Sequence, residues 1–94
     1  QFSATEAQQM GLVDRIVPEA ELDAYVHDYA MTIAGNAPKT MHAAKTSILE
    51  HLKDPADRDL ALCDRLVDEC HASQDYHEGR TAFMEKRKPN FTGR

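Results

Sequence analysis

Residues 73–91 read SQDYHEGRTAFMEKRKPNF, and this stretch predicts a single helix with a defined start and stop. Ser73 belongs to the residue types that cap helix N-termini, because its hydroxyl can accept a hydrogen bond from a free backbone amide. Asp75 and Glu78 follow in the first turns, where acidic side chains suit the positive end of the helix dipole. Pro89 cannot continue a helix. We therefore expect a helix that begins after Ser73 and ends before Pro89.

One face of this predicted helix carries Tyr76, Gly79 and Phe83 at helical spacing. Large aromatic side chains can pack there, while glycine would let a neighbouring backbone approach closely. Lys86 and Arg87 fall in the expected last turn, where cations suit the negative end of the dipole. The pattern indicates a helix that docks on another part of the protein.

Three longer helices are expected upstream, over residues 19–34, 38–52 and 54–72, because apolar residues recur there at helical spacing. Pro38 and Pro55 suit first helical positions, and Asp54 suits an N-cap. The apolar band of the third helix is broad and comprises Leu60, Leu62, Cys63, Leu66, Val67 and Cys70. A band of this width predicts burial against two surfaces, one within the chain and one between subunits.

The N-terminal segment predicts a short helix followed by a strand. Ser3 and Glu6 have the spacing of a capping box, and Gly11 can end the helix in the left-handed conformation. The following run Leu12–Val17 is rich in β-branched residues and predicts a short strand. No other stretch of the chain resembles a strand, so its ladder partners must lie in other sequence. The expected fold class is mainly α, with four to five helices and one short N-terminal strand.

Charge is divided unevenly along the 94 residues. Residues 80–94 contain five basic residues and one acid, whereas residues 1–79 contain six basic residues and fifteen acids. The acidic body argues against general binding of nucleic acids. The basic end is consistent with one local anionic partner, such as a phosphate, or with the ordinary preference for cations at a helix C-terminus.

Cys63 and Cys70 are separated by two helical turns, which is too far for a disulfide within one helix. We interpret both as buried thiols. The chain shows no signal peptide and no transmembrane run, so we expect no membrane partner and a cytoplasmic location. An organelle matrix is the other possibility if a targeting segment precedes these residues.

The histidines and cysteines do not form a convincing metal or catalytic pattern. Cys70, His71 and His77 are the nearest to a cluster, but Cys70 lies on the apolar face and His71 must point about 100° away from it. A catalytic cysteine–histidine pair also needs an oxyanion site, and the chain has no glycine-rich turn that could form one. We therefore expect no metal, no cofactor and no catalytic residue in this chain.

The order S-x-D-x-x-E-G-x-x-A-F-x-E-K-R-x-P-x-F in residues 73–91 resembles the C-terminal signature of the enoyl-CoA hydratase/isomerase family, also called the crotonase family. Residues 3–18, with Ala37, Pro38 and Lys45, are similar to the same family in its usual order. The resemblance covers essentially the whole chain. A complete α/β enzyme of this kind needs about 250 residues, so the chain would be the last third of one.

The resemblance implies a C-terminal helical module of an α/β crotonase-like fold. Residues 1–18 would end the crotonase-like core, and residues 19–94 would form a helical region that builds trimers or hexamers and covers acyl-CoA. The parent enzyme would hydrate or isomerise enoyl-CoA thioesters in fatty-acid or related metabolism. The groups that polarise the thioester, and the acid/base residues, would lie upstream, so the fragment itself would be inactive.

By the same resemblance, Lys86 of the E-K-R motif would bind the adenine or phosphate end of CoA on a neighbouring subunit. The other interpretation of Lys86 is a cation that serves only its own helix end. Some hydratases have an aromatic residue against adenine at the position of Val67, and valine cannot stack in that way. Hydratase, isomerase and other acyl-CoA reactions of the family therefore stay open.

A different class of function is a complete, small helical domain that binds other proteins and has no enzyme parent. The unpaired strand argues against it, because a self-sufficient domain would not retain a β-branched strand without a partner.

Overall fold

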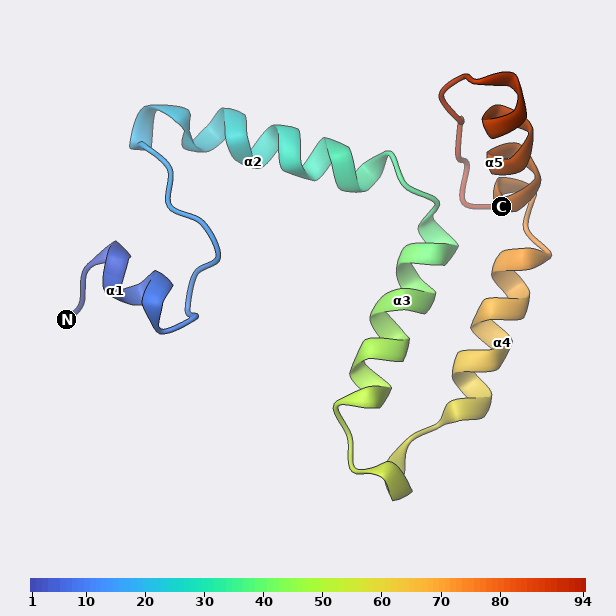
Figure 1. The fold of residues 1–94 in the computed structure, drawn as a ribbon, viewed down its shortest axis with the longest axis horizontal. Helices are drawn as coiled ribbons and strands as arrows, with labels where there is room; N and C mark the ends of the chain where they lie inside the picture. The colour runs from blue at the N-terminus through green and yellow to red at the C-terminus, as the bar shows by residue number, and fades with distance from the viewer. The chain divides into compact units, whose positions relative to one another are not determined.

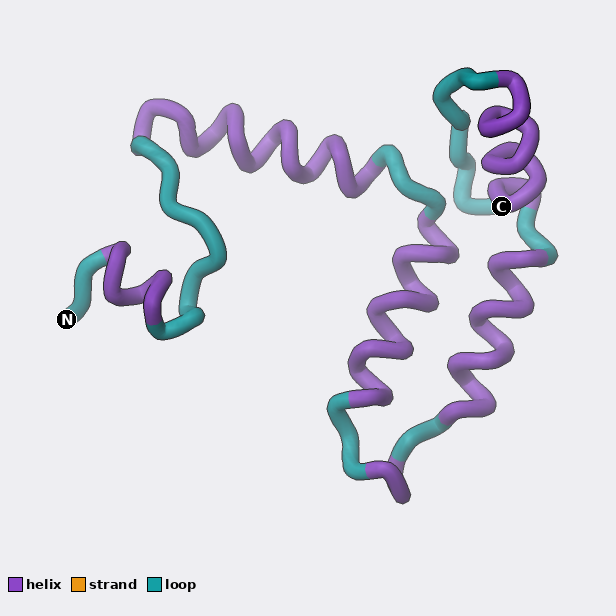
Figure 2. Tube along the Cα trace, viewed as in Figure 1, coloured by secondary structure: helices purple, strands orange, loops and turns teal.

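The computed structural model describes all 94 residues and consists of helices joined by loops (Figures 1 and 2). The elements are α1 (Ala4–Gln9), α2 (Glu19–Ala34), α3 (Pro38–His51), the 3-10 helix η1 (Pro55–Asp57), α4 (Leu60–His71) and α5 (Gln74–Glu85). This confirms the mainly α fold class and the number of helices. None of these helices has both the length and the apolar character needed to cross a membrane. The chain forms two compact units, Gln1–Met31 and Thr32–Arg94.

The predicted capping box begins α1. Ser3 Oγ accepts a hydrogen bond from the Glu6 amide at 3.2 Å, and Glu6 Oε2 accepts one from the Ser3 amide at 2.7 Å. This amide is the main reason that the pKa of Glu6 is lowered. Gly11 follows the helix with φ +76°, the left-handed conformation expected for it.

The strand expected at Leu12–Val17 is absent, and the segment is a loop (Figure 2). Leu12 is 65% exposed, and the Asp14 carbonyl accepts a hydrogen bond from the Gln8 side chain instead of from another strand. A strand is stable only when its backbone groups pair with a neighbour, and this chain contains no such neighbour. The β-branched pattern was therefore insufficient to specify a strand here.

Helix α2 has the predicted bounds, and the side-chain amide of Asn36 closes its end by donating to the Thr32 carbonyl at 2.9 Å. No residue of α2 is buried. Its apolar stripe includes Val26 and Tyr29, which are 54% and 60% exposed. The periodicity thus predicted the helix correctly, but the stripe is uncovered.

Helices α3 and α4 form an antiparallel hairpin (Figure 1). Its core is small and is built around Ala43 and Leu66, which are 7% and 9% exposed. The short side chain of Ala43 permits close approach of the two helices. Cys63 and Cys70, expected to be buried, are half-buried free thiols.

The helix expected to start at Pro55 is broken. Pro55 begins only the short η1, Arg58 is extended, and α4 starts at Leu60 with the Asp59 carboxylate as its cap. At this break the Glu50 carboxylate accepts a hydrogen bond from the Asp59 amide at 2.8 Å and pairs with Lys53 at 2.6 Å. These contacts hold the Asp59 amide outside any helix.

Candidate functional site

Helix α5 begins as predicted. Ser73 is 5% exposed, and its hydroxyl accepts a hydrogen bond from the Tyr76 amide at 3.1 Å. The same hydroxyl donates to the Cys70 carbonyl at 2.6 Å, which connects the start of α5 to the end of α4. Ser73 therefore both caps α5 and fixes the corner between the two helices.

The last eight residues, 87–94, fold back along α5, and we call them the terminal strap (Figure 1). Asp75, which is 2% exposed, holds the end of the strap. Its carboxylate accepts hydrogen bonds from the Thr92 amide at 2.7 Å and the Gly93 amide at 2.8 Å, and its own amide donates to the Arg94 carbonyl at 3.0 Å. Asp75 thus fastens the end of the strap to α5, in addition to the helix-dipole role expected from its position.

Glu78 holds the beginning of the strap. Its two carboxylate oxygens accept from the guanidinium of Arg87 at 2.7 and 3.0 Å, and one of them also accepts from the Asn90 amide at 2.8 Å. The Arg87 hydrogen bonds, followed by the Asn90 amide, lower the pKa of Glu78 to about 2. The pKa of Arg87 is raised in turn, chiefly by Glu78.

Gly79 accommodates a side chain, not the neighbouring backbone we expected. A methyl group added at Gly79 would lie 3.5 Å from the Phe91 ring, so the ring of the strap packs over this position. Gly93 has φ +80° and lies against Pro38, the first residue of α3. The strap therefore contacts two helices.

Lys86 lies just beyond α5, which ends at Glu85. Its backbone is left-handed, with φ 54° and ψ 40°, so neither Lys86 nor Arg87 belongs to the last helical turn. The Lys86 amide donates to the Phe83 carbonyl at 3.2 Å, and the Arg87 amide donates to the Ala82 carbonyl at 3.0 Å. These two bonds are those of a Schellman motif. The Lys86 side chain is exposed and takes part in none of the three ion pairs.

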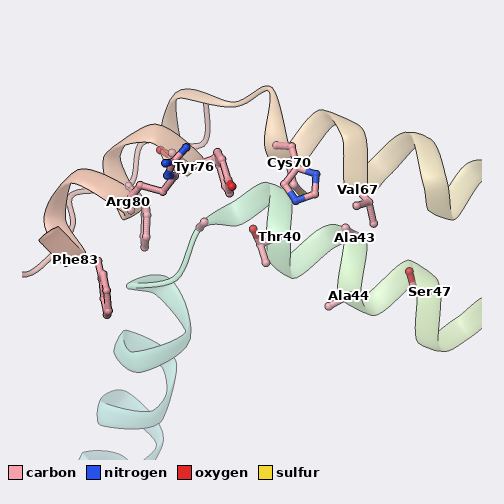
Figure 3. A pocket seen from close by; sticks show the side chains of 14 residues that line it. Thr40, Ala43, Ala44, Ser47, Val67, Cys70, Tyr76, Arg80 and Phe83 are labelled. Atoms are coloured by element: carbon pink, nitrogen blue, oxygen red, sulfur yellow. The ribbon is translucent and has the colours of Figure 1, made fainter.

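A groove of about 630 Å³ lies between α3, α4 and α5 (Figure 3). Ala43, Ala44 and Val67 form part of its apolar lining, and Phe83 and Phe91 line it at the α5 side. Phe83 is nevertheless 82% exposed, so it does not act as a buried anchor within this chain. Lys86 does not line the groove.

Aromatic and basic side chains gather around Tyr76 in the same groove. The His71 ring meets the Tyr76 ring edge-on with centroids 5.2 Å apart, and the Arg80 guanidinium lies 5.8 Å from the Tyr76 centroid. The His77 ring, which does not line the groove, also meets the Tyr76 ring edge-on, with centroids 6.0 Å apart. No three histidine, cysteine, aspartate or glutamate side chains lie together as metal ligands would.

The sequence profile of one protein family, described as "Enoyl-CoA hydratase/isomerase", matches residues 1–94. The chain is 37% identical to a probable enoyl-CoA hydratase of Rhodobacter capsulatus, over 99% of this chain and 36% of that protein. It is 34% identical to the 2,3-dehydroadipyl-CoA hydratase of Escherichia coli, with the same two coverages. The chain thus spans about a third of the length of these relatives.

Solved structures agree with the sequence comparisons. An enoyl-CoA hydratase of Bacillus anthracis superposes with a TM-score of 0.85 and 30% identity, over 98% of this chain and 36% of that one. An enoyl-CoA hydratase/isomerase of Mycobacterium paratuberculosis gives a TM-score of 0.82 and 32% identity, again over 98% and 36%.

Proposed function

Because the chain belongs to the enoyl-CoA hydratase/isomerase family, we propose that it is the C-terminal part of an acyl-CoA enzyme. The observation that carries this proposal is the match over residues 1–94 to about a third of several hydratases. Residues 1–18 would then end the catalytic core. Residues 19–94 would form the helical region that assembles subunits and covers the acyl-CoA.

The contribution to the CoA site centres on Lys86. Its side chain is exposed and free of the ion pairs that occupy Arg87 and Lys53, so its charge is available to an external anion. An ammonium group is a suitable point charge for a phosphate. The substrate would be an enoyl-CoA thioester, in keeping with the names of the relatives.

In the full-length enzyme, Lys86→Ala should weaken binding of CoA esters by about 1–3 kcal/mol, because a charge-assisted contact is lost. The chemical step should stay near normal at saturating substrate, so the change should appear in KM and not in kcat. The effect should shrink as salt rises. Steady-state kinetics with crotonyl-CoA at two ionic strengths would measure it.

Lys88→Ala is the matched control, since it removes the same charge two residues away. The Lys88 carbonyl, which accepts from Arg87, is kept in this variant. An unchanged KM for Lys86→Ala, in a variant with wild-type assembly, would contradict the proposed contact. Equal losses of affinity for CoA esters in Lys86→Ala and Lys88→Ala would indicate a general effect of positive charge.

Assembly into trimers or hexamers of the parent enzyme is the second part of the proposal. Large apolar side chains stay exposed on α3, α4 and α5 and directly after α3, namely Ile48, Leu52, Leu60, Val67, Phe83 and Met84. Large exposed apolar patches are typical of surfaces that other chains cover, and we assign these side chains to contacts between subunits.

The isolated chain should therefore self-associate at high micromolar concentration, since association removes these side chains from water. Light scattering measures the mass directly. A dilution series distinguishes reversible association from aggregation, and a monomer mass at high concentration would contradict the prediction.

A further inference from the structure

The left-handed residue at the end of α5 is a lysine, although glycine is the usual residue in this conformation. Lys86 is the only residue other than glycine with a positive φ in the structure. A side chain makes this conformation unfavourable, because its Cβ crowds the following carbonyl. The turn must therefore be held by interactions around it.

Those interactions come from the next residue, Arg87. Its amide closes the Schellman motif on Ala82, and its guanidinium reaches back along α5 to both oxygens of Glu78. The Arg87 Nε also donates to Glu85 at 2.5 Å, so carboxylates on both sides of the guanidinium restrain it. Backbone and side chain of Arg87 are thus both fixed to α5.

We propose that the Glu78–Arg87 pair is a positioning device that holds the left-handed turn and so sets the direction of the Lys86 side chain. Its use in binding CoA rests on the function proposed above for Lys86. With the turn held, a lysine can occupy this position and present its charge from a defined point. Without the pair, residue 86 would relax toward right-handed conformations and its ammonium group would sample other positions.

Glu78→Gln tests the pair, because the amide oxygen can still accept from the Asn90 amide while the charge that binds Arg87 is lost. In the full-length protein we expect faster hydrogen exchange at the Lys86 and Arg87 amides. Calorimetry should show a Kd for coenzyme A raised about two- to tenfold. Glu85→Gln is the control on the same helix. It should change the amide exchange rates and the Kd for coenzyme A much less, because Glu85 accepts only one of the Arg87 hydrogen bonds.

The double variant Glu78→Gln/Lys86→Ala separates positioning from other effects. If Glu78 acts through Lys86, the double variant should bind CoA no more weakly than Lys86→Ala alone. If Glu78→Gln weakens CoA binding as much in the Lys86→Ala background as it does in the wild type, the proposal is overturned. Unchanged amide exchange at Lys86 and Arg87 in Glu78→Gln would overturn it as well. Arg87→Gln, which breaks the pair from the other side, gives the same test if Glu78→Gln fails to assemble.

Different measurements test the contact between Lys86 and CoA and the role of the Glu78–Arg87 pair. If Lys86→Ala binds CoA as the wild type does, the contact between Lys86 and CoA is refuted. The exchange rates at Lys86 and Arg87 still decide whether the pair holds the turn.

Discussion

Residues 1–94 alone should show no measurable hydration or isomerisation of an enoyl-CoA thioester. The reaction needs backbone donors that polarise the thioester carbonyl, and a free carboxylate or similar group to move a proton. Asp75 is the one carboxylate that lines the groove, and both of its oxygens accept hydrogen bonds from strap amides. The other buried carboxylate, Glu50, is occupied by Asp59 and Lys53.

The decrease in ultraviolet absorbance of a conjugated enoyl-CoA would measure this activity. The full-length enzyme, purified from the same host, is the positive control, and a host lacking its own hydratases removes the main contaminant. Turnover that rises in proportion to the concentration of the fragment would contradict the prediction and place catalytic groups within these residues.

Asp75→Ala should lower the free energy of unfolding by about 2–4 kcal/mol, the scale of losing two hydrogen bonds to a buried charged group. The variant should also release the end of the strap, because the Thr92 and Gly93 amides lose their acceptor. Phe91 would then pack less well over Gly79. Urea denaturation of the full-length protein measures the first effect, and hydrogen exchange at Thr92 and Gly93 measures the second.

Asp68→Ala removes an exposed acid from α4 and should change stability by less than about 0.5 kcal/mol. It is the matched control for loss of charge. Asp75→Asn keeps one acceptor oxygen, so its loss in free energy of unfolding should lie between those of Asp75→Ala and Asp68→Ala. Unaltered exchange at Thr92 and Gly93 in Asp75→Ala would show that Asp75 does not hold the strap.

Local chemistry was sufficient to predict where most helices begin and end. Ser3 and Ser73 cap their helices, Gly11 is left-handed, and α2 has the expected bounds. These features depend on hydrogen bonds between residues only three or four positions apart, so the residue types alone are informative. The motif of residues 73–91 likewise indicated the family that the comparisons establish.

Contacts between more distant residues required the tertiary structure. Glu50 meets Asp59 nine positions away, Glu78 meets Arg87 at the same separation, and Asp75 meets Gly93 eighteen positions away. The Glu50 contact lies where the helix expected at Pro55 is broken, and the Asp75 and Glu78 contacts fasten the strap to α5. Helical and strand periodicities relate residues within one element, whereas each of these pairs joins a helix to a residue outside it.

Burial also depended on tertiary structure. An apolar stripe shows which face of a helix avoids water, but hydrophobic attraction is not directional and does not say what covers that face. Phe83 and α2 are therefore exposed although their patterns predicted packing. The segment Leu12–Val17 is a loop for the related reason that a strand needs a second strand, and amino-acid preference cannot supply one.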